Sequence, residues 1–597
     1  MVLSSAPEQG PSLILIEGCL TAIAFAVAFG WPRLGTKYFE RVERAFGRLA
    51  RRKSLSVAVV GLAAFLLRLA ILPVSPIPKP FVQDDFSFLL AADTFASGRL
   101  TNPTPAMWTH FETMHITMQP TYMSMYFPAQ GLVLAASKVL TGRPWYGVLL
   151  MTALMCAAIC WMLQAWLPPT WALLGGALAV LRLGLFSYWI DTYSGAGSIA
   201  ALGGALLLGA LPRFMKAARL RDGLLMATGV ILVETSRLYE GMLLCLPVLC
   251  YLAWWMFFGK NRPSTTMLLR RTAAPLALIV AAGAWMGYYD YRVFGSPLTL
   301  PYTVDRVQYA MAPYFVWQAQ RPEPVYRHKE IREFYYRSEV NTFAKIHSWS
   351  GFVPQTVLKA ARGVLFYTGI ALLIPLIMLR RVFLDHRLRF LVLCLLVLLA
   401  GQLVQIFLIP HYLAPFTAAF YAIGLQAMRH LRLWSPGNEP VGLTLVRLTV
   451  VLCVVLAGVR LCSGPLHLDL PVWPGAWASE WYGRGSQSGA ERAQLEANLE
   501  QLPGRQLVIV RYSPDHNVLD EWVYNAADID SSKVIWAQEM DEAENLELFH
   551  YYKDRTVWLV EPDTKPAKVS PYLSPTQESM RQPMKIAAGS SGYVNCQ

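Results

Sequence analysis

Residues 54–72 read SLSVAVVGLAAFLLRLAIL, an apolar run of the length that crosses a bilayer as one helix. Similar runs recur along the chain, in which 55% of the residues are hydrophobic and only 15% are charged. A chain of this composition has to be solvated largely by lipid rather than folded around one soluble core. The sequence therefore predicts a mainly α-helical, polytopic membrane protein.

The number of apolar runs sets the expected number of helices. The first run has no basic leader and no short core of the kind found in a cleaved signal peptide, so we expect it to remain as the first helix. We predict about twelve spanning helices of about 20 residues each, near residues 12–31, 54–72, 145–165, 169–188, 196–212, 222–236, 239–258, 272–290, 356–379, 388–409, 413–428 and 441–463.

The basic residues predict the orientation of these helices. The net charge of +13 comes from short clusters between apolar runs, which is the pattern of positive-inside topology rather than of a nucleic-acid-binding surface. We expect a multi-pass protein of the bacterial inner (plasma) membrane, with its N-terminus and its C-terminal domain extracytoplasmic. The clusters expected in the cytoplasm are Arg33 to Lys53, Arg213 to Arg221, Lys260 to Arg271, Arg380 to Arg389 and Arg429 to Arg447.

This orientation places two long loops, 73–144 and 291–355, on the outer face. The predicted transmembrane domain, 1–463, is followed by a linker over 464–489 that is rich in Pro, Gly and Ser. Residues 490–597 then alternate helix-like and strand-like segments, which indicates a small extracytoplasmic α/β domain. Its expected strands are Gln506 to Val510, Lys533 to Ala537 and Thr556 to Val560, with helices at Ala490 to Gln501 and Asp541 to Tyr552.

Two adjacent carboxylates, Asp84 and Asp85, open the first outer loop's amphipathic segment, directly after a predicted membrane helix. A carboxylate beside hydrocarbon is costly unless it is hydrated or partnered, and such residues are usually functional. A surface Asp pair often has no function, but this position favours a catalytic one.

This layout resembles the glycosyltransferase C superfamily, in particular the polyprenyl-phosphate-sugar-dependent enzymes related to the protein O-mannosyltransferases and the lipid A aminoarabinose transferase. The resemblance covers roughly residues 54–430. Those enzymes carry an Asp-Glu pair in this loop, whose Asp is thought to act as the base. By position Asp84 matches the base, and Asp85 replaces the Glu with a shorter acid. The resemblance implies a helical bundle of this fold and a single displacement that inverts the anomeric centre.

The chemistry explains the need for an acid at this place. An acceptor hydroxyl or amine is a poor nucleophile until a base takes its proton, and a positioned carboxylate typically contributes about 10²- to 10⁴-fold. The donor's phosphate gains negative charge as it departs and needs stabilisation. No nucleotide sugar is available outside the membrane, so a lipid-carried donor is the natural substrate.

Two arginines are candidates for the donor phosphate. Arg237 lies at a predicted outer turn, and an ion pair with Glu240 or Glu234 is the structural alternative. Arg182 lies in the outer half of its apolar run, where pairing with Asp191 is the alternative. Related transferases often have a Lys before a Pro-Pro pair in the first loop, but this chain has Met125-Tyr126-Phe127-Pro128-Ala129 instead, which shifts the expectation to Arg237.

Further polar and aromatic side chains are predicted to line the substrate site. A metal site from His110, Glu112 and His115 fits no regular zinc spacing, so we assign no metal ligands. We expect no tightly bound cofactor and leave a divalent cation open. The candidate substrate-binding residues are His110, Glu112, His115, Tyr122, Tyr126, Tyr239, Glu240, His411 and Tyr412.

The leading hypothesis is a membrane glycosyltransferase that moves a sugar from a polyprenyl-phosphate donor to a lipid, glycan or protein acceptor. Its expected partners are that donor, that acceptor and membrane lipid, without nucleic acid. The alternatives are a lipid or solute transporter and a non-catalytic membrane assembly protein. Transporters usually show paired halves with broken helices, and the sequence shows no such symmetry.

Overall fold

The computed structural model describes residues 11–195, 197–259, 263–468, 470, 481 and 489–572. The chain divides into two compact units that interleave in sequence. The first unit comprises residues 1–104, 113–490 and 518–521, and the second comprises 105–112, 491–517 and 522–597. Most of the predicted linker, 469, 471–480 and 482–488, lies outside the described residues.

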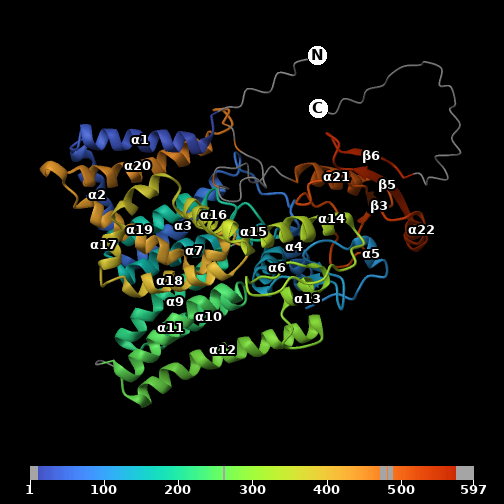
Figure 1. Cartoon of the computed structure of the whole chain (residues 1–597), viewed down its shortest axis with the longest axis horizontal. Coiled ribbons are helices and arrows are strands. Elements are labelled where there is room, and N and C mark those ends of the chain that lie inside the picture. The colour runs from blue at the N-terminus through green and yellow to red at the C-terminus, as the bar shows by residue number, and fades with distance from the viewer. Residues whose placement is uncertain are drawn as a thin grey trace. The chain divides into compact units, whose positions relative to one another are not determined.

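Within the described residues, seven helices of the first unit are long and apolar enough to cross a membrane. This number indicates a multi-pass membrane protein. All seven coincide with predicted runs, because a bilayer-length apolar segment satisfies its backbone hydrogen bonds internally only as a helix. They are α1 (Leu13–Gly30), α3 (Lys53–Ala70), α7 (Trp145–Trp166), α9 (Ser198–Ala217), α11 (Leu238–Phe258), α12 (Thr265–Phe294) and α20 (Val441–Leu461), as labelled in Figure 1.

The other five predicted spans are helical but short or bent, so the expected count of twelve full spans is too high. Pro410 and Pro415 turn the start of the predicted run 413–428 into the 3-10 helix η4 (Pro410–Phe416). The run 388–409 ends as a helix at Val404, where Gln405 pairs with Phe315. The shortened helices are α8 (Pro169–Ala179) with the π-turn η1 (Val180–Gly184), α10 (Leu220–Glu234), α18 (Arg389–Val404) and α19 (Thr417–Arg432).

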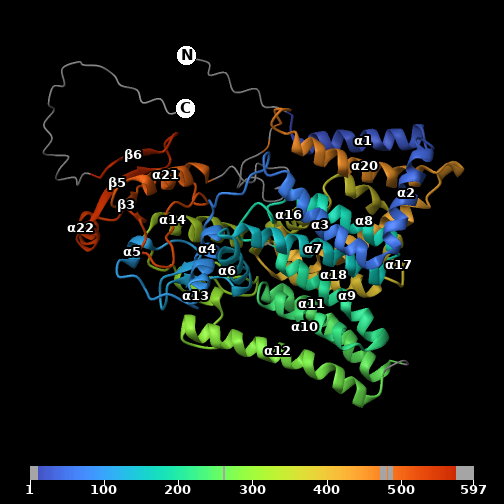
Figure 2. The ribbon, with the colours of Figure 1, turned by 180° about the vertical axis from the view of Figure 1, so that it is seen from behind.

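The predicted span 356–379 is a broken helix. Helix α16 (Trp349–Thr368) meets the pair η3 (Ala371–Met378) and α17 (Leu379–Leu384) at an angle of 109°. Gly369 lies at the break with φ +58°. The backbone N–H groups of Ile370 and Ala371 donate to one oxygen of Glu17, each over 2.9 Å. A carboxylate from α1 therefore satisfies the backbone that the break exposes. Figures 1 and 2 both show α1 beside α20.

Shorter elements between the spans carry the polar loops. The helices α4 (Gln83–Ala96) and α6 (Pro128–Thr141) pack against each other, and each has buried residues. Both lie within the predicted loop 73–144. The remaining elements of the first unit are α2 (Thr36–Arg51), β1 (Ile116–Thr117), β2 (Met123–Ser124), α13 (Pro301–Tyr309), α14 (Lys329–Arg332), η2 (Glu333–Val340), α15 (Asn341–His347) and η5 (Pro436–Asn438).

The second unit contains the predicted α/β elements. Its sheet has the order β4-β3-β5-β6, in which β3 is parallel to both β4 and β5, and β6 is antiparallel to β5. Strand β6 was not predicted from the sequence. The core is formed by buried side chains such as Val508, Trp536 and Val560. The elements are α5 (Trp108–Phe111), α21 (Ala490–Gln501), β3 (Arg505–Val510), β4 (Val534–Gln538), α22 (Glu542–Tyr551), β5 (Arg555–Glu561) and β6 (Lys568–Pro571).

Candidate functional site

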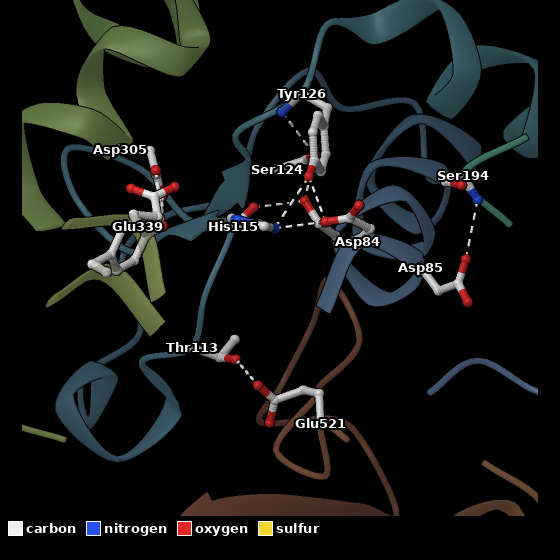
Figure 3. A network of polar contacts seen from close by, with 12 residues as sticks. Asp84, Asp85, Thr113, His115, Ser124, Tyr126, Ser194, Asp305, Glu339 and Glu521 are labelled. Carbon is white, nitrogen blue, oxygen red and sulfur yellow. Dashed lines mark hydrogen bonds and ion pairs between the residues drawn. The ribbon is translucent and has the colours of Figure 1, made fainter. Parts of the chain in front are cut away.

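Asp84 lies in the first turn of α4, where two side chains hydrogen-bond to the same carboxylate oxygen. Tyr126 donates its hydroxyl to Oδ1 over 2.5 Å, and His115 Nδ1 lies 2.6 Å from that oxygen (Figure 3). The Asp84 side chain keeps 27% of its surface exposed. The site is therefore a carboxylate that is held from one side and accessible from another.

His115 reaches Asp84 from an unusual backbone conformation. It lies just before β1 with φ +64°, a left-handed geometry that costs a non-glycine residue about 1–3 kcal/mol. Its carbonyl accepts hydrogen bonds from the Ser87 hydroxyl over 2.6 Å and from the Met125 N–H over 3.1 Å. Ser87 belongs to the same helix as Asp84, so α4 fixes both the ring and the backbone of His115.

The electrostatics of the pair keep both members charged. Burial alone would raise the pKa of Asp84, but the hydrogen bond and charge of His115, the Tyr126 hydroxyl and the charge of Arg237 together lower it. Burial would lower the pKa of His115, but Asp84, with Asp305 and Glu339 further away, raises it. The ionised form of Asp84 and the protonated form of His115 are therefore both favoured.

Asp85 points away from Asp84, because consecutive residues of a helix are about 100° apart around its axis. Its carboxylate accepts the N–H groups of Tyr193, over 2.7 Å, and Ser194, over 3.1 Å (Figure 3). Burial raises the pKa of Asp85 to about 7, against the effect of these two bonds. Asp85 thus anchors the loop after η1.

Arg237 lies in the turn between α10 and α11, where the sequence analysis expected it. Its guanidinium lies over the ring of Tyr412, 4.6 Å from the centroid. Tyr302 of α13 meets the ring of Tyr126 edge-on at 5.7 Å, and burial raises the pKa of Tyr302 while Arg237 opposes that shift. Arg237 and Tyr412 are thus brought into the surroundings of Asp84, with Tyr302 as an additional aromatic residue.

A second set of charged residues comes from the loop 291–355. Arg306 donates from one nitrogen to both oxygens of Glu339, over 2.8 and 2.7 Å, and Tyr335 donates to Asp305. Neither acid was a sequence candidate, nor was Tyr302, since a long loop of mixed charge gives no signal of what it approaches.

Other predicted substrate residues have different partners. His411 Nδ1 and the Tyr188 hydroxyl share a hydrogen bond of 2.8 Å, and burial followed by the charge of Arg237 lowers the pKa of His411. Tyr239 donates to the Gly401 carbonyl, and Glu240 is buried near Arg237. Tyr122 is buried beside Asn102. His110 and Glu112 belong to the second unit, whereas His115 belongs to the first.

Arg182 has contacts separate from the Asp84 pair. It donates to the carbonyls of Phe366, over 2.9 Å, and Leu365, over 2.7 Å, and lies over the ring of Trp481. Asp191, the partner that the sequence suggested for Arg182, instead pairs with the fully buried Arg68 over 2.9 Å. Arg182 lies within the π-turn η1, whereas Asp191 lies in the loop that follows it.

The acids around Asp84 already have hydrogen-bonding partners. Among the described residues, no group of three or more His, Cys, Asp or Glu side chains has the arrangement of a metal site. Asp84 is hydrogen-bonded to His115 and Tyr126. Asp305 is hydrogen-bonded to Tyr335, and Glu339 to Arg306.

The chain matches no protein-family model and no curated protein. Among solved structures it resembles the Archaeoglobus fulgidus oligosaccharyltransferase. The apo form gives a TM-score of 0.44 at 9% identity, covering 77% of this chain and 62% of that one. The complex with Zn and sulfate gives 0.45 at 9%, covering 85% and 67%, and the complex with an inhibitory peptide and a dolichol-phosphate gives 0.43 at 10%, covering 85% and 69%. Because these scores are low, the function has to be inferred from the site.

Proposed function

We propose that this chain is an integral-membrane glycosyltransferase of the glycosyltransferase C type. It would move a sugar from a polyprenyl-phosphate donor to a lipid, glycan or protein acceptor at the outer face of the membrane. The observation that carries the proposal is the ionised, accessible carboxylate of Asp84, which His115 and Tyr126 hold and whose pKa the charge of Arg237 helps to lower.

Asp84 and Arg237 supply the two opposite functions that sugar transfer requires. Asp84 accepts the proton of the acceptor hydroxyl or amine as its oxygen or nitrogen bonds to the anomeric carbon. The bond from that carbon to the phosphate oxygen breaks at the same time, and the leaving phosphate keeps the electron pair. Arg237 offsets the negative charge that grows on the phosphate. Attack and departure on opposite faces of the sugar invert the anomeric centre.

The aromatic residues around the two charges suit a sugar. Tyr302 and Tyr412 are only partly buried, and their rings and hydroxyls suit a pyranose, whereas Tyr126 is buried against Asp84 and Phe88. His115 keeps Asp84 ionised and oriented.

The test is Asp84→Asn in the full chain, reconstituted in proteoliposomes with polyprenyl-phosphate-linked sugars as donors. We expect transfer to fall by about 10²- to 10⁴-fold, because Asn has the shape of Asp but accepts no proton. Asp93→Asn is the matched control, since Asp93 lies in the same helix and pairs with Lys138. Unchanged transfer by Asp84→Asn in normally inserted protein would contradict the role of Asp84 as base.

A further inference from the structure

Four residues of the tail, 518–521, belong to the first unit although the residues on both sides of them belong to the second. We refer to residues 518–521 as the clasp. The buried carboxylate of Glu521 accepts the hydroxyl of Thr113 (Figure 3). The Glu521 N–H donates to the Phe81 carbonyl over 2.8 Å. Val518 packs on the cluster that contains Met114 and Tyr335. The clasp thus contacts both outer loops within the first unit.

The two residues that hydrogen-bond to Glu521 come shortly before Asp84 and His115 in the sequence. Thr113 precedes His115 by two residues, and Phe81 precedes Asp84 by three. The Phe81 main chain also hydrogen-bonds to Asp85, so it is held from both sides. Glu521 therefore restrains the chain where it enters α4 and where it approaches His115.

His115 needs this restraint more than an ordinary loop residue does. Its left-handed backbone persists only if its neighbours hold it. On its C-terminal side, the His115 carbonyl accepts hydrogen bonds from Ser87 and Met125. On its N-terminal side, Thr113 is bonded to Glu521, and these two residues are only 3% and 5% exposed. A buried bond from a hydroxyl to a carboxylate is shorter and stronger than a neutral one.

We propose that Glu521 is a positioning residue, which acts through Thr113 and Phe81 to hold His115 against Asp84. The tail then contributes to the geometry of the site from more than 400 residues away in the sequence. This inference rests on the proposed function of Asp84 and His115, but Glu521 itself touches no reacting atom.

The experiment uses the full chain and compares substitutions that remove the Thr113–Glu521 bond with substitutions that keep it. Thr113→Val and Glu521→Ala remove the bond, whereas Thr113→Ser and Glu521→Gln keep a hydroxyl and a carbonyl oxygen. We expect the first two to lower kcat by about 10- to 100-fold with little change in the donor KM, because small misplacements of catalytic groups cost this much. We expect the two conservative variants to stay close to wild type.

The pH profile separates positioning from a general loss of folded protein. If His115 moves away, the pKa of Asp84 rises, so the acid limb of kcat shifts to higher pH in Thr113→Val and Glu521→Ala. The double variant should be no worse than either single one, since both remove the same bond. Glu547→Ala removes an exposed acid of α22 in the same tail and should change neither kcat nor the limb.

Two outcomes would overturn the proposal. One is a double variant whose loss of kcat is the sum of the two single losses, and the other is a pH profile of kcat whose acid limb stays in place in Thr113→Val, which has nearly the shape of Thr. If wild-type protein transferred no sugar from any donor, the proposed function would fail separately. The coupling between Thr113→Val and Glu521→Ala would then be measured on thermal unfolding in detergent, where independent effects would contradict the clasp.

Discussion

His115 and Tyr126 bond to the same oxygen of Asp84, and only His115 adds a positive charge. Because Asp84 has a lowered pKa in the folded protein, it stays ionised until the pH falls below its ordinary value of 3.8. His115→Gln removes the charge but keeps a polar side chain. We expect the pKa of Asp84 to rise and the acid limb of kcat to move to higher pH, measured as a pH profile of sugar transfer. A limb that stays in place would show that His115 does not control the ionisation of Asp84.

Asp85 is predicted to serve the loop after η1 rather than the reaction. Asp85→Asn keeps an oxygen for the N–H groups of Tyr193 and Ser194, so transfer should show nothing near the roughly 10²-fold loss expected for a catalytic base. Asp85→Ala leaves these donors without that acceptor and should cost about 1–3 kcal/mol of stability. Thermal unfolding in detergent measures the difference.

The same carboxyl also predicts a pH dependence of stability. Because its folded pKa is about 7, above the ordinary 3.8, the folded state keeps a proton that the unfolded state loses between these values. The stability contribution of Asp85 therefore falls as the pH rises through that window. Asp85→Asn should remove this part of the pH dependence, and an unchanged pH dependence would contradict the raised pKa.

The broken helix between α16 and η3 depends on a residue of α1. Glu17 is 2% exposed and accepts the N–H groups of Ile370 and Ala371. Glu17→Ala leaves both donors without this acceptor, and we expect a loss of about 1–3 kcal/mol in the free energy of unfolding. Glu17→Gln retains one oxygen and should lose less. Equal stability of the Ala variant and wild type would show that the break needs no cap.

The orientation of the whole chain in the membrane is predicted by its basic clusters. Arg48 of α2 and Arg337 of η2 are both exposed, and they belong to regions expected on opposite faces. In a chain freed of its own cysteines, Arg337→Cys should react with a membrane-impermeant maleimide added outside. Arg48→Cys should react only after the membrane is opened. The reverse pattern would contradict the predicted topology and the outer-face location of Asp84.

The apolar runs were sufficient to locate helices, because a run of bilayer length has to satisfy its own backbone hydrogen bonds. They were not sufficient to decide which helices are full spans. The shortening at Pro410 and Pro415 and the break at Gly369 depend on local backbone geometry and on the cap from Glu17. The strands β3, β4 and β5 of the second unit were likewise located as strand-like runs, whereas the mostly exposed β6 was not predicted.

By itself, the sequence determined the apolar helices of a multi-pass membrane protein, and it predicted the outer position of two loops and a role for Asp84 and Arg237, since hydropathy and charge beside hydrocarbon are properties of local composition. Only the tertiary structure decided which side chains meet. It directed Asp85 away from Asp84 and placed His115 and Tyr126 on one oxygen of Asp84. It also brought Tyr302 against Tyr126 and Glu521 against Thr113. These contacts join segments tens to hundreds of residues apart, and their partners are chosen by packing and hydrogen bonding that no local pattern encodes.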